Sequence, residues 1–287
     1  MAGTSMAERD TWFGNDTRFR LFTAAKYLVY LLLSFNIYLF LQEELAALSF
    51  TFADGIAPGQ FIQAFSATID TAAWVILLLM FELETAVLND NNIHGLVKWG
   101  LHGLRGLCCI ALVYAFTGYY QELATLYQVS PLSVADACSL VGGDYSVLVD
   151  LDEYVPLDAV NCAALGGQVF TVAGFDILVD SETLRSAQLL AWVDVVNAAD
   201  WLLVVVVLEV EVRLQLRGDL SDQVMNATKV VKLIIYAILF LCAGYWAYAG
   251  DFLDFYDAAL WLFAFIFIEL NVFEWQYETD AEHPVTA

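Results

Sequence analysis

Paired acidic residues follow long apolar runs at matched places in the chain. Glu82 and Glu84 come directly after an unbroken apolar stretch from Ala72 to Phe81. The same spacing returns in two later apolar segments, so that the full set is Glu82 and Glu84, Glu209 and Glu211, and Glu269 and Asn271. A charged carboxylate in apolar surroundings is costly. Each one needs a counter-charge, a bound cation or a proton.

The acids belong to a longer pattern that recurs three times. Segments 69–85, 196–212 and 256–272 align without a gap. Each carries a polar residue, a tryptophan four positions later and a glutamate eight positions after that. The polar residues and tryptophans are Asp70 and Trp74, Asn197 and Trp201, and Asp257 and Trp261. Such self-similarity predicts a two-helix unit repeated three times.

Basic residues are candidate counter-charges for Glu82, Glu209 and Glu269, which we call the inner glutamates because they lie towards the expected cytoplasmic side. Lys26, Arg105 and Lys232 lie near the inner ends of the helices that precede the three segments. Three Glu–Lys/Arg clamps, one per repeat, would be a purely structural solution. Two acids then remain, Glu84 and Glu211. Either basic residues at the ends of the helices form ion pairs with these two acids, or the acids are protonated, or they hold a cation with Asn271 as a neutral oxygen ligand. These alternatives stay open.

The polar residues at the outer ends have a simpler explanation. Asp70, Asn197 and Asp257, with Asp194 and Asp254, fall near the expected N-termini of their helices. Free backbone N–H groups and the helix dipole favour carboxylates there. We expect these residues to be helix-terminal features.

The elements that carry these residues are apolar windows long enough to span a bilayer. Hydrophobic residues make up 60% of the chain and charged residues 16%, against about 25% charged in soluble domains. Six windows lie at about 21–42, 68–88, 104–125, 188–212, 230–249 and 254–275. Helices are expected, because lipid offers no partner to backbone polar groups. The predicted fold is an all-α polytopic membrane protein of six transmembrane helices, arranged as three hairpins, with a small β-containing extracytoplasmic cap between helices 3 and 4.

Charge sets the expected topology. Ten of the eleven Lys and Arg residues gather in the N-terminal segment and at the junctions of helices 2 with 3 and 4 with 5. The positive-inside rule therefore predicts a multi-pass protein of the plasma (inner) membrane with both termini cytoplasmic. The predicted parts are a cytoplasmic segment 1–20, helices 1–3 in 21–125, the cap in 126–187, helices 4–6 in 188–275 and a cytoplasmic tail 276–287.

The predicted cap is acidic and contains two cysteines. Cys138 and Cys162 are expected to form a disulfide, since an extracytoplasmic location permits one. The segment 166–180 reads as a hairpin with Gly174 near its turn, and 145–155 adds a further strand. The acids of "DLDEY" (150–154) lack the spacing of a known calcium loop. We expect them to form a solvated acidic face.

Two functions remain compatible with the sequence. The first is a cation or proton channel or transporter that uses the carboxylates near the cytoplasmic side. The second is a non-catalytic membrane subunit or scaffold, in which the glutamates form salt bridges and the cap binds a partner. No nucleophile–base pair, cofactor motif or basic patch stands out, so we expect no enzyme activity, no cofactor and no nucleic acid. The expected partners are the lipid bilayer and a monovalent cation or proton. A second copy of the chain or a membrane-complex partner stays open.

Overall fold

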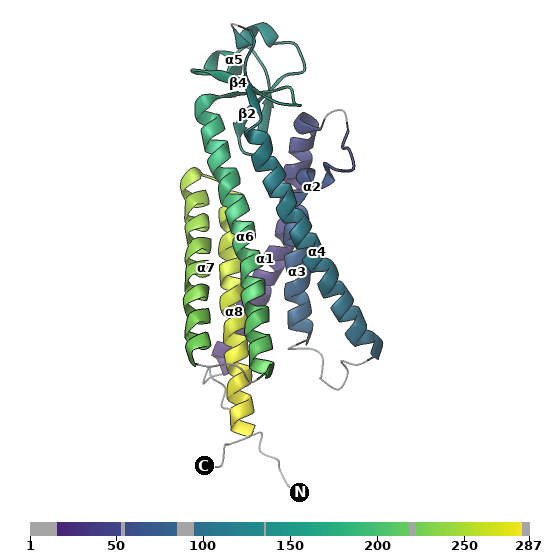
Figure 1. The fold of residues 1–287 in the computed structure, drawn as a ribbon, viewed down its shortest axis with the longest axis vertical. Coiled ribbons are helices and arrows are strands. Elements are labelled where there is room, and N and C mark those ends of the chain that lie inside the picture. The colour runs from purple at the N-terminus through teal and green to yellow at the C-terminus, as the bar shows by residue number, and fades with distance from the viewer. Residues whose placement is uncertain (1–15, 53–54, 85–94, 135, 218–221, 283–287) are drawn as a thin grey trace.

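The computed structural model is a helical bundle with a small sheet at one end (Figure 1). The structure describes residues 16–52, 55–84, 95–134, 136–217 and 222–282. Within these ranges, the side chains at 16–19, 208, 209, 211–226 and 268–282 lie outside the description. The statements below concern the described part of the chain.

Long helices form the body of the molecule. They are α1 (Asp16–Thr51), α3 (Ser66–Glu82), α4 (Gly95–Leu126), α6 (Ser181–Arg217), α7 (Asp222–Ala249) and α8 (Phe252–Glu282). Each predicted apolar window overlaps one of them. Four helical segments are long and apolar enough to cross a membrane: Arg20–Thr51, Gly95–Leu126, Ser181–Val207 and Ala227–Ala249. The chain is therefore compatible with a membrane-embedded protein.

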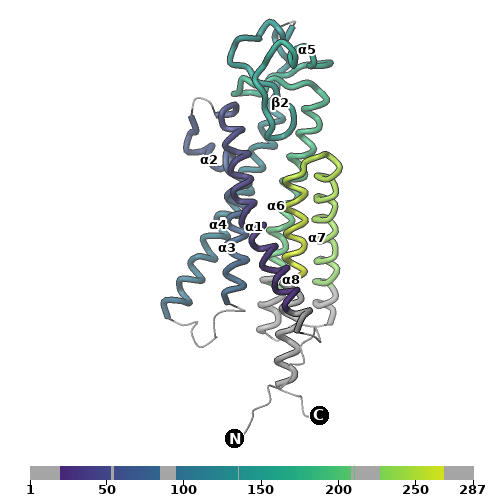
Figure 2. The backbone as a smooth tube through the Cα atoms, turned by 180° about the vertical axis from the view of Figure 1, so that it is seen from behind, coloured from purple at the N-terminus to yellow at the C-terminus, as the bar shows by residue number. Residues whose placement is uncertain are grey.

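The long helices pack in a closed ring. Contacts join α1 to α3, α3 to α4, α4 to α6, α6 to α7, α7 to α8, and α8 back to α1. Both chain ends lie at one end of the bundle and the sheet lies at the other (Figures 1 and 2). We call these the termini end and the cap end.

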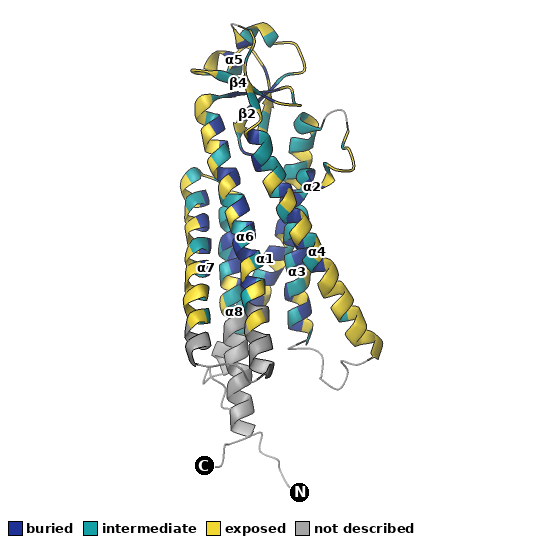
Figure 3. Cartoon of the chain, in the orientation of Figure 1, coloured by how far each residue is buried: buried dark blue, intermediate teal, exposed yellow. Residues whose placement is uncertain are grey.

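The outer surface of the ring is rich in exposed apolar side chains. Leu28, Leu31, Phe240 and Leu241 are examples. Towards the termini end, α4 diverges from the bundle and is exposed over most of its surface (Figure 3). Large exposed apolar areas are unusual in soluble monomers, and a bilayer would cover them.

The cap is a five-stranded sheet inserted between α4 and α6. Its strands are β1 (Val129–Pro131), β2 (Ser146–Asp150), β3 (Glu153–Pro156), β4 (Val169–Val172) and β5 (Ile177–Asp180), in the order β1-β4-β5-β2-β3. β2 and β5 are parallel and the other neighbours antiparallel. The predicted hairpin is present, with Gly174 at φ 85° in its turn. The predicted Cys138–Cys162 disulfide is confirmed. A disulfide that closes a loop of this length stabilises the folded state by about 3 kcal/mol.

Short contacts fix the cap to the bundle. Strand β5 leads directly into α6, and Asp180 caps that helix by accepting from the backbone N–H groups of Glu182 and Thr183. At the end of α1, the ring of Phe50 stacks on Tyr154 with 6.0 Å between centroids. Phe52 meets Phe175 edge-on in the same region, so α1 docks against the sheet.

A glycine sets the contact between α4 and the short helix α2 (Phe61–Ala64). A Cβ at Gly118 would lie 2.7 Å from the carbonyl oxygen of Ile62 and 2.8 Å from the Cβ of Ser66. Backbone atoms cannot move aside as a flexible side chain can. The two segments therefore approach this closely because residue 118 has no side chain.

We predict that Gly118→Ala lowers stability by about 1–3 kcal/mol, because overpacking forces the helices apart. Thermal unfolding of the purified protein in detergent measures the change. Gly244→Ala is the matched control, since a Cβ added at that helical glycine would meet no neighbouring atom within 4 Å. Alanine there should be neutral or stabilising. Equal melting temperatures for the two variants would contradict the close contact.

Candidate functional site: an acidic cavity

A cavity lies at the cap end, between the helices and the sheet. Its volume is about 120 Å³. Eight carboxylates are among the described residues that line it: Glu43, Glu44, Asp70, Glu122, Asp152, Asp194, Asp254 and Asp257. No Lys, Arg or His occurs in that described lining. The described lining is therefore rich in acidic groups and holds no basic side chain to neutralise them.

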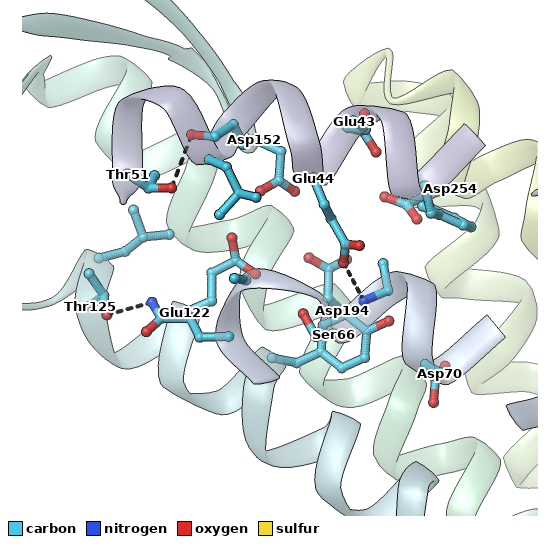
Figure 4. Close-up of a pocket in the computed structure, with 18 of the residues that line it drawn as sticks. Glu43, Glu44, Thr51, Ser66, Asp70, Glu122, Thr125, Asp152, Asp194 and Asp254 are labelled. Carbon is cyan, nitrogen blue, oxygen red and sulfur yellow. Dashed lines mark hydrogen bonds between the residues drawn. The ribbon is translucent and has the colours of Figure 1, made fainter. Parts of the chain in front are cut away.

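The carboxylates come from every side of the cavity (Figure 4). Helix α1 contributes two, α8 contributes two, and α3, α4 and α6 contribute one each. The remaining one, Asp152, lies in the turn between β2 and β3 of the cap. Closing the ring of helices and docking the sheet are both needed to assemble this lining.

Glu44 is compensated by a helix terminus. Its carboxylate accepts from the backbone N–H groups of Ala67 and Thr68, at 2.8 and 3.3 Å, and from the hydroxyl of Thr68. These residues form the first turn of α3. The positive end of the helix dipole thus faces an acid supplied by a different helix.

Neutral donors hold other carboxylates of the lining. The indole N–H of Trp246 donates to Asp194 at 3.1 Å. Asp257 accepts from the amide of Asn36 at 2.7 Å and also from Trp261. These donors fix the position of each carboxylate and add no positive charge.

One pair of carboxyl groups joins the cap to the bundle. The side chains of Glu122 on α4 and Asp152 in the cap are hydrogen-bonded to one another. A hydrogen bond between two carboxyl groups requires a proton on one of them. Burial, with the nearby charges of Asp251 and Asp150, raises the pKa of Asp152 to about 6. Part of the negative charge is thus already met by a proton.

Asp152 has an unusual backbone. Among the described non-glycine residues it is the one with a positive φ, at 65°. Asp and Asn tolerate this left-handed conformation better than most residues. The turn directs an acid from the sheet into the cavity, which corrects the expectation of a wholly solvated acidic face at 150–154.

Three tryptophans cluster beside the cavity, and two of them, Trp201 and Trp261, line it. Trp74, Trp201 and Trp261 meet with ring centroids 5.7, 6.2 and 6.3 Å apart. They come from α3, α6 and α8, the alternate members of the ring. These are the tryptophans that the sequence alignment matched, and their clustering closes the centre of the bundle below the acids.

Carboxylates at the termini end are in a different environment. Glu82 is buried and its Oε1 lies 2.7 Å from Lys26 Nζ, with further hydrogen bonds from the hydroxyls of Tyr27 and Tyr30. Arg105 lies 2.7 Å from Glu84, because α4 packs directly beside α3. Its predicted clamp with Glu209 involves a side chain outside the described part of the chain.

Several predicted residues lie on helices but outside the described side chains. They are Glu209 and Glu211 on α6, and Glu269 and Asn271 on α8. The clamps predicted for these positions, including the one with Lys232 of α7, stay predictions.

The outer-end residues Asp70, Asn197 and Asp257 all line the cavity. Helix α6 starts at Ser181, so Asp194 and Asn197 lie several turns inside it. The helix-terminus explanation does not apply to these two residues, because α6 extends well beyond the apolar window into the cap.

The sequence analysis missed four members of the lining: Glu43, Glu44, Glu122 and Asp152. Glu122 lay inside an apolar window and could have been found as an ionisable residue at membrane depth. Glu43 and Glu44 come just after the first predicted apolar window, which ends at about residue 42, whereas α1 continues to Thr51. Nothing local in the sequence indicates that the turn at Asp152 reaches back to the helices.

We predict that Glu82→Gln destabilises the protein by about 3–5 kcal/mol, because it leaves the Lys26 ammonium buried and unpaired. Adding Lys26→Gln should restore part of that loss. The measurement is thermal unfolding of both variants in detergent. The control is Glu84→Gln, whose partner is half-exposed and whose loss should cost under about 1 kcal/mol. Additive losses in the double variant would argue against a buried clamp.

We predict that Asp152→Asn changes how stability depends on pH. The pKa of Asp152 is higher in the folded than in the unfolded chain, so its protonation favours folding. That contribution is complete below about pH 4 and is lost as the pH rises through about 6. The variant should be more stable than the parent protein by about 3 kcal/mol near pH 8 and equally stable near pH 4.

Unfolding measured across this pH range tests the effect. Glu153→Gln is the control, because the neighbouring side chain is exposed, and it should leave the profile unchanged. A difference between Asp152→Asn and the parent protein that is the same at every pH would contradict the assignment.

Comparisons with known proteins give no match: no protein-family model, curated protein or solved structure is similar to this chain.

Proposed function

We propose that the protein is an integral membrane channel or transporter that takes cations or protons into the acidic cavity. In this proposal α3 and α8 complete a membrane domain of six spanning helices. The cap is extracytoplasmic, and both termini lie in the cytoplasm of a plasma (inner) membrane protein. The protein performs no catalysis, and its partners are the bilayer and the ion it carries.

One observation carries the proposal: eight carboxylates face a common cavity whose described lining contains no basic residue. Charges of one sign at close range in a medium of low dielectric repel strongly. Hydrogen bonds from indole, amide and backbone groups orient the carboxylates without neutralising them. Protons or cations entering the cavity supply the missing positive charge, and a lining of this sign excludes anions.

The threefold pattern supports a transport role. Matched positions of the three repeats meet at the tryptophan cluster, and sites at repeat interfaces are common in transporters. For an ion to move from the cavity towards the termini end, the three indole rings of this cluster must move apart. Glu82 and Glu84 are held in ion pairs, so we assign the binding step to the cap end. The candidates for the site where the ion leaves the protein remain Glu209, Glu211, Glu269 and Asn271.

The ion pairs favour a second candidate function. Lys26–Glu82 and Arg105–Glu84 are the kind of clamp expected in a non-catalytic membrane subunit or scaffold. In that case the cap or an exposed helix face binds a partner, and the cavity carries no ion across the membrane. The two functions differ in whether the purified protein alone moves ions.

Reconstitution in liposomes tests the proposal. We expect the parent protein to dissipate a proton or monovalent-cation gradient. Asp257→Asn and Glu122→Gln each remove one acidic group from the cavity and should slow the flux about tenfold, the change that corresponds to about 1.4 kcal/mol of lost cation binding. Glu182→Gln, an exposed acid in the first turn of α6, should leave it unchanged. No flux under any gradient, from folded protein, would leave the subunit function instead.

A further inference from the structure

The cavity is as aromatic as it is acidic. Beside the carboxylates, its described lining includes Trp201, Trp246, Trp261, Tyr119, Tyr154 and Phe175. Acidic and aromatic side chains are also neighbours in pairs. The indole of Trp246 is hydrogen-bonded to Asp194, and that of Trp261 to Asp257.

This pairing determines what a bound cation would meet. Asp194 and Trp246 are joined by a hydrogen bond of 3.1 Å from the indole N–H, so the two side chains lie close together in the lining. Aromatic rings attract cations that lie over the ring face within about 6 Å of its centre, and tryptophan does so most strongly. Lining rings whose faces meet the cavity therefore add to the carboxylates in attracting a cation, and they favour one with an apolar surface.

The distribution of the carboxylates suits a cation with a diffuse charge. Small hard cations such as Ca²⁺ take six to eight oxygen ligands at about 2.3–2.6 Å around one point. The labelled carboxylates instead lie spread around the wall (Figure 4). Among the described residues, no group of three or more His, Cys, Asp or Glu side chains is close enough to hold a metal ion.

We infer that the cavity binds an organic ammonium ion, such as a quaternary or small primary amine, between its carboxylates and its aromatic rings. The inference rests on the proposed function, since it names the class of cation that the cavity accepts. A cavity of about 120 Å³ leaves room for a molecule larger than a bare ion. A headgroup with a phosphate is disfavoured, because the carboxylates repel it.

Binding to the purified full-length protein tests the inference. The probes are tetramethylammonium, choline, phosphocholine and Na⁺, in a detergent without ammonium groups and at constant ionic strength. Calorimetry and thermal unfolding should both detect tetramethylammonium and choline. Phosphocholine should bind at least about tenfold more weakly than choline, as expected for one added repulsive charge. Equal affinities for choline and phosphocholine would indicate a lipid headgroup site and overturn the preference for a free ammonium ion.

Aromatic variants separate the rings from the charges. Tyr154→Leu and Trp246→Leu should each weaken tetramethylammonium binding by roughly three- to thirtyfold, the range expected for one lost cation–π contact. Tyr154 is only partly buried, which keeps the test usable if the buried Trp246 variant fails to fold. Trp192→Leu is the control, because that indole is exposed and outside the lining.

The outcomes distinguish this inference from the proposed function. Proton or Na⁺ flux that Asp257→Asn slows, without binding of tetramethylammonium or choline, would overturn the inference and leave the proposed function in place. Loss of flux and of all cation binding together would remove both. Equal effects of the Tyr154 and Trp192 substitutions would overturn the role of the rings.

Discussion

The cost of placing carboxylates inside an apolar bundle governs this structure. A buried charge needs compensation by an opposite charge, by hydrogen-bond donors, or by a proton. The two ends of the bundle meet this requirement differently. At the termini end, Lys26 neutralises Glu82 at 2.7 Å. At the cap end, donors to Asp194 and Asp257 are neutral, so any charge on those carboxylates is left for a diffusible cation or a proton to balance.

The tryptophan cluster lies between the carboxylates of the termini end and those of the cap end. The indoles of Trp74, Trp201 and Trp261 fill the centre of the ring where α3, α6 and α8 converge. This apolar layer lowers the local dielectric, which strengthens electrostatic interactions beside it. Trp201 and Trp261 belong both to the core of the bundle and to the lining of the cavity.

The sequence predicted the helices well because their signal is local. The length of an apolar segment can be found from that segment alone, and so can its need to pair its own backbone groups in lipid. The spacing from polar residue to tryptophan to glutamate is also local, and it could be recognised because it recurs in three segments. The cavity depends on segments far apart in the chain. Glu122 and Asp152 are joined by a hydrogen bond between a helix and the cap, and no periodicity in the sequence records it. A local explanation, the helix terminus, was therefore assigned to Asp194, which lies deep in α6.

The cap belongs to the site as well as to the surface. Its β2–β3 turn adopts a left-handed conformation at Asp152, and the strain of such a residue persists only where the surroundings fix it. Here the surroundings are the stacked ring of Tyr154 on Phe50 and the carboxyl of Glu122. These contacts tie the sheet to α1 and α4 at the points where those helices line the cavity. Any movement of the sheet would therefore change the acidic and aromatic surface of the cavity, so the cap and the bundle together determine its lining.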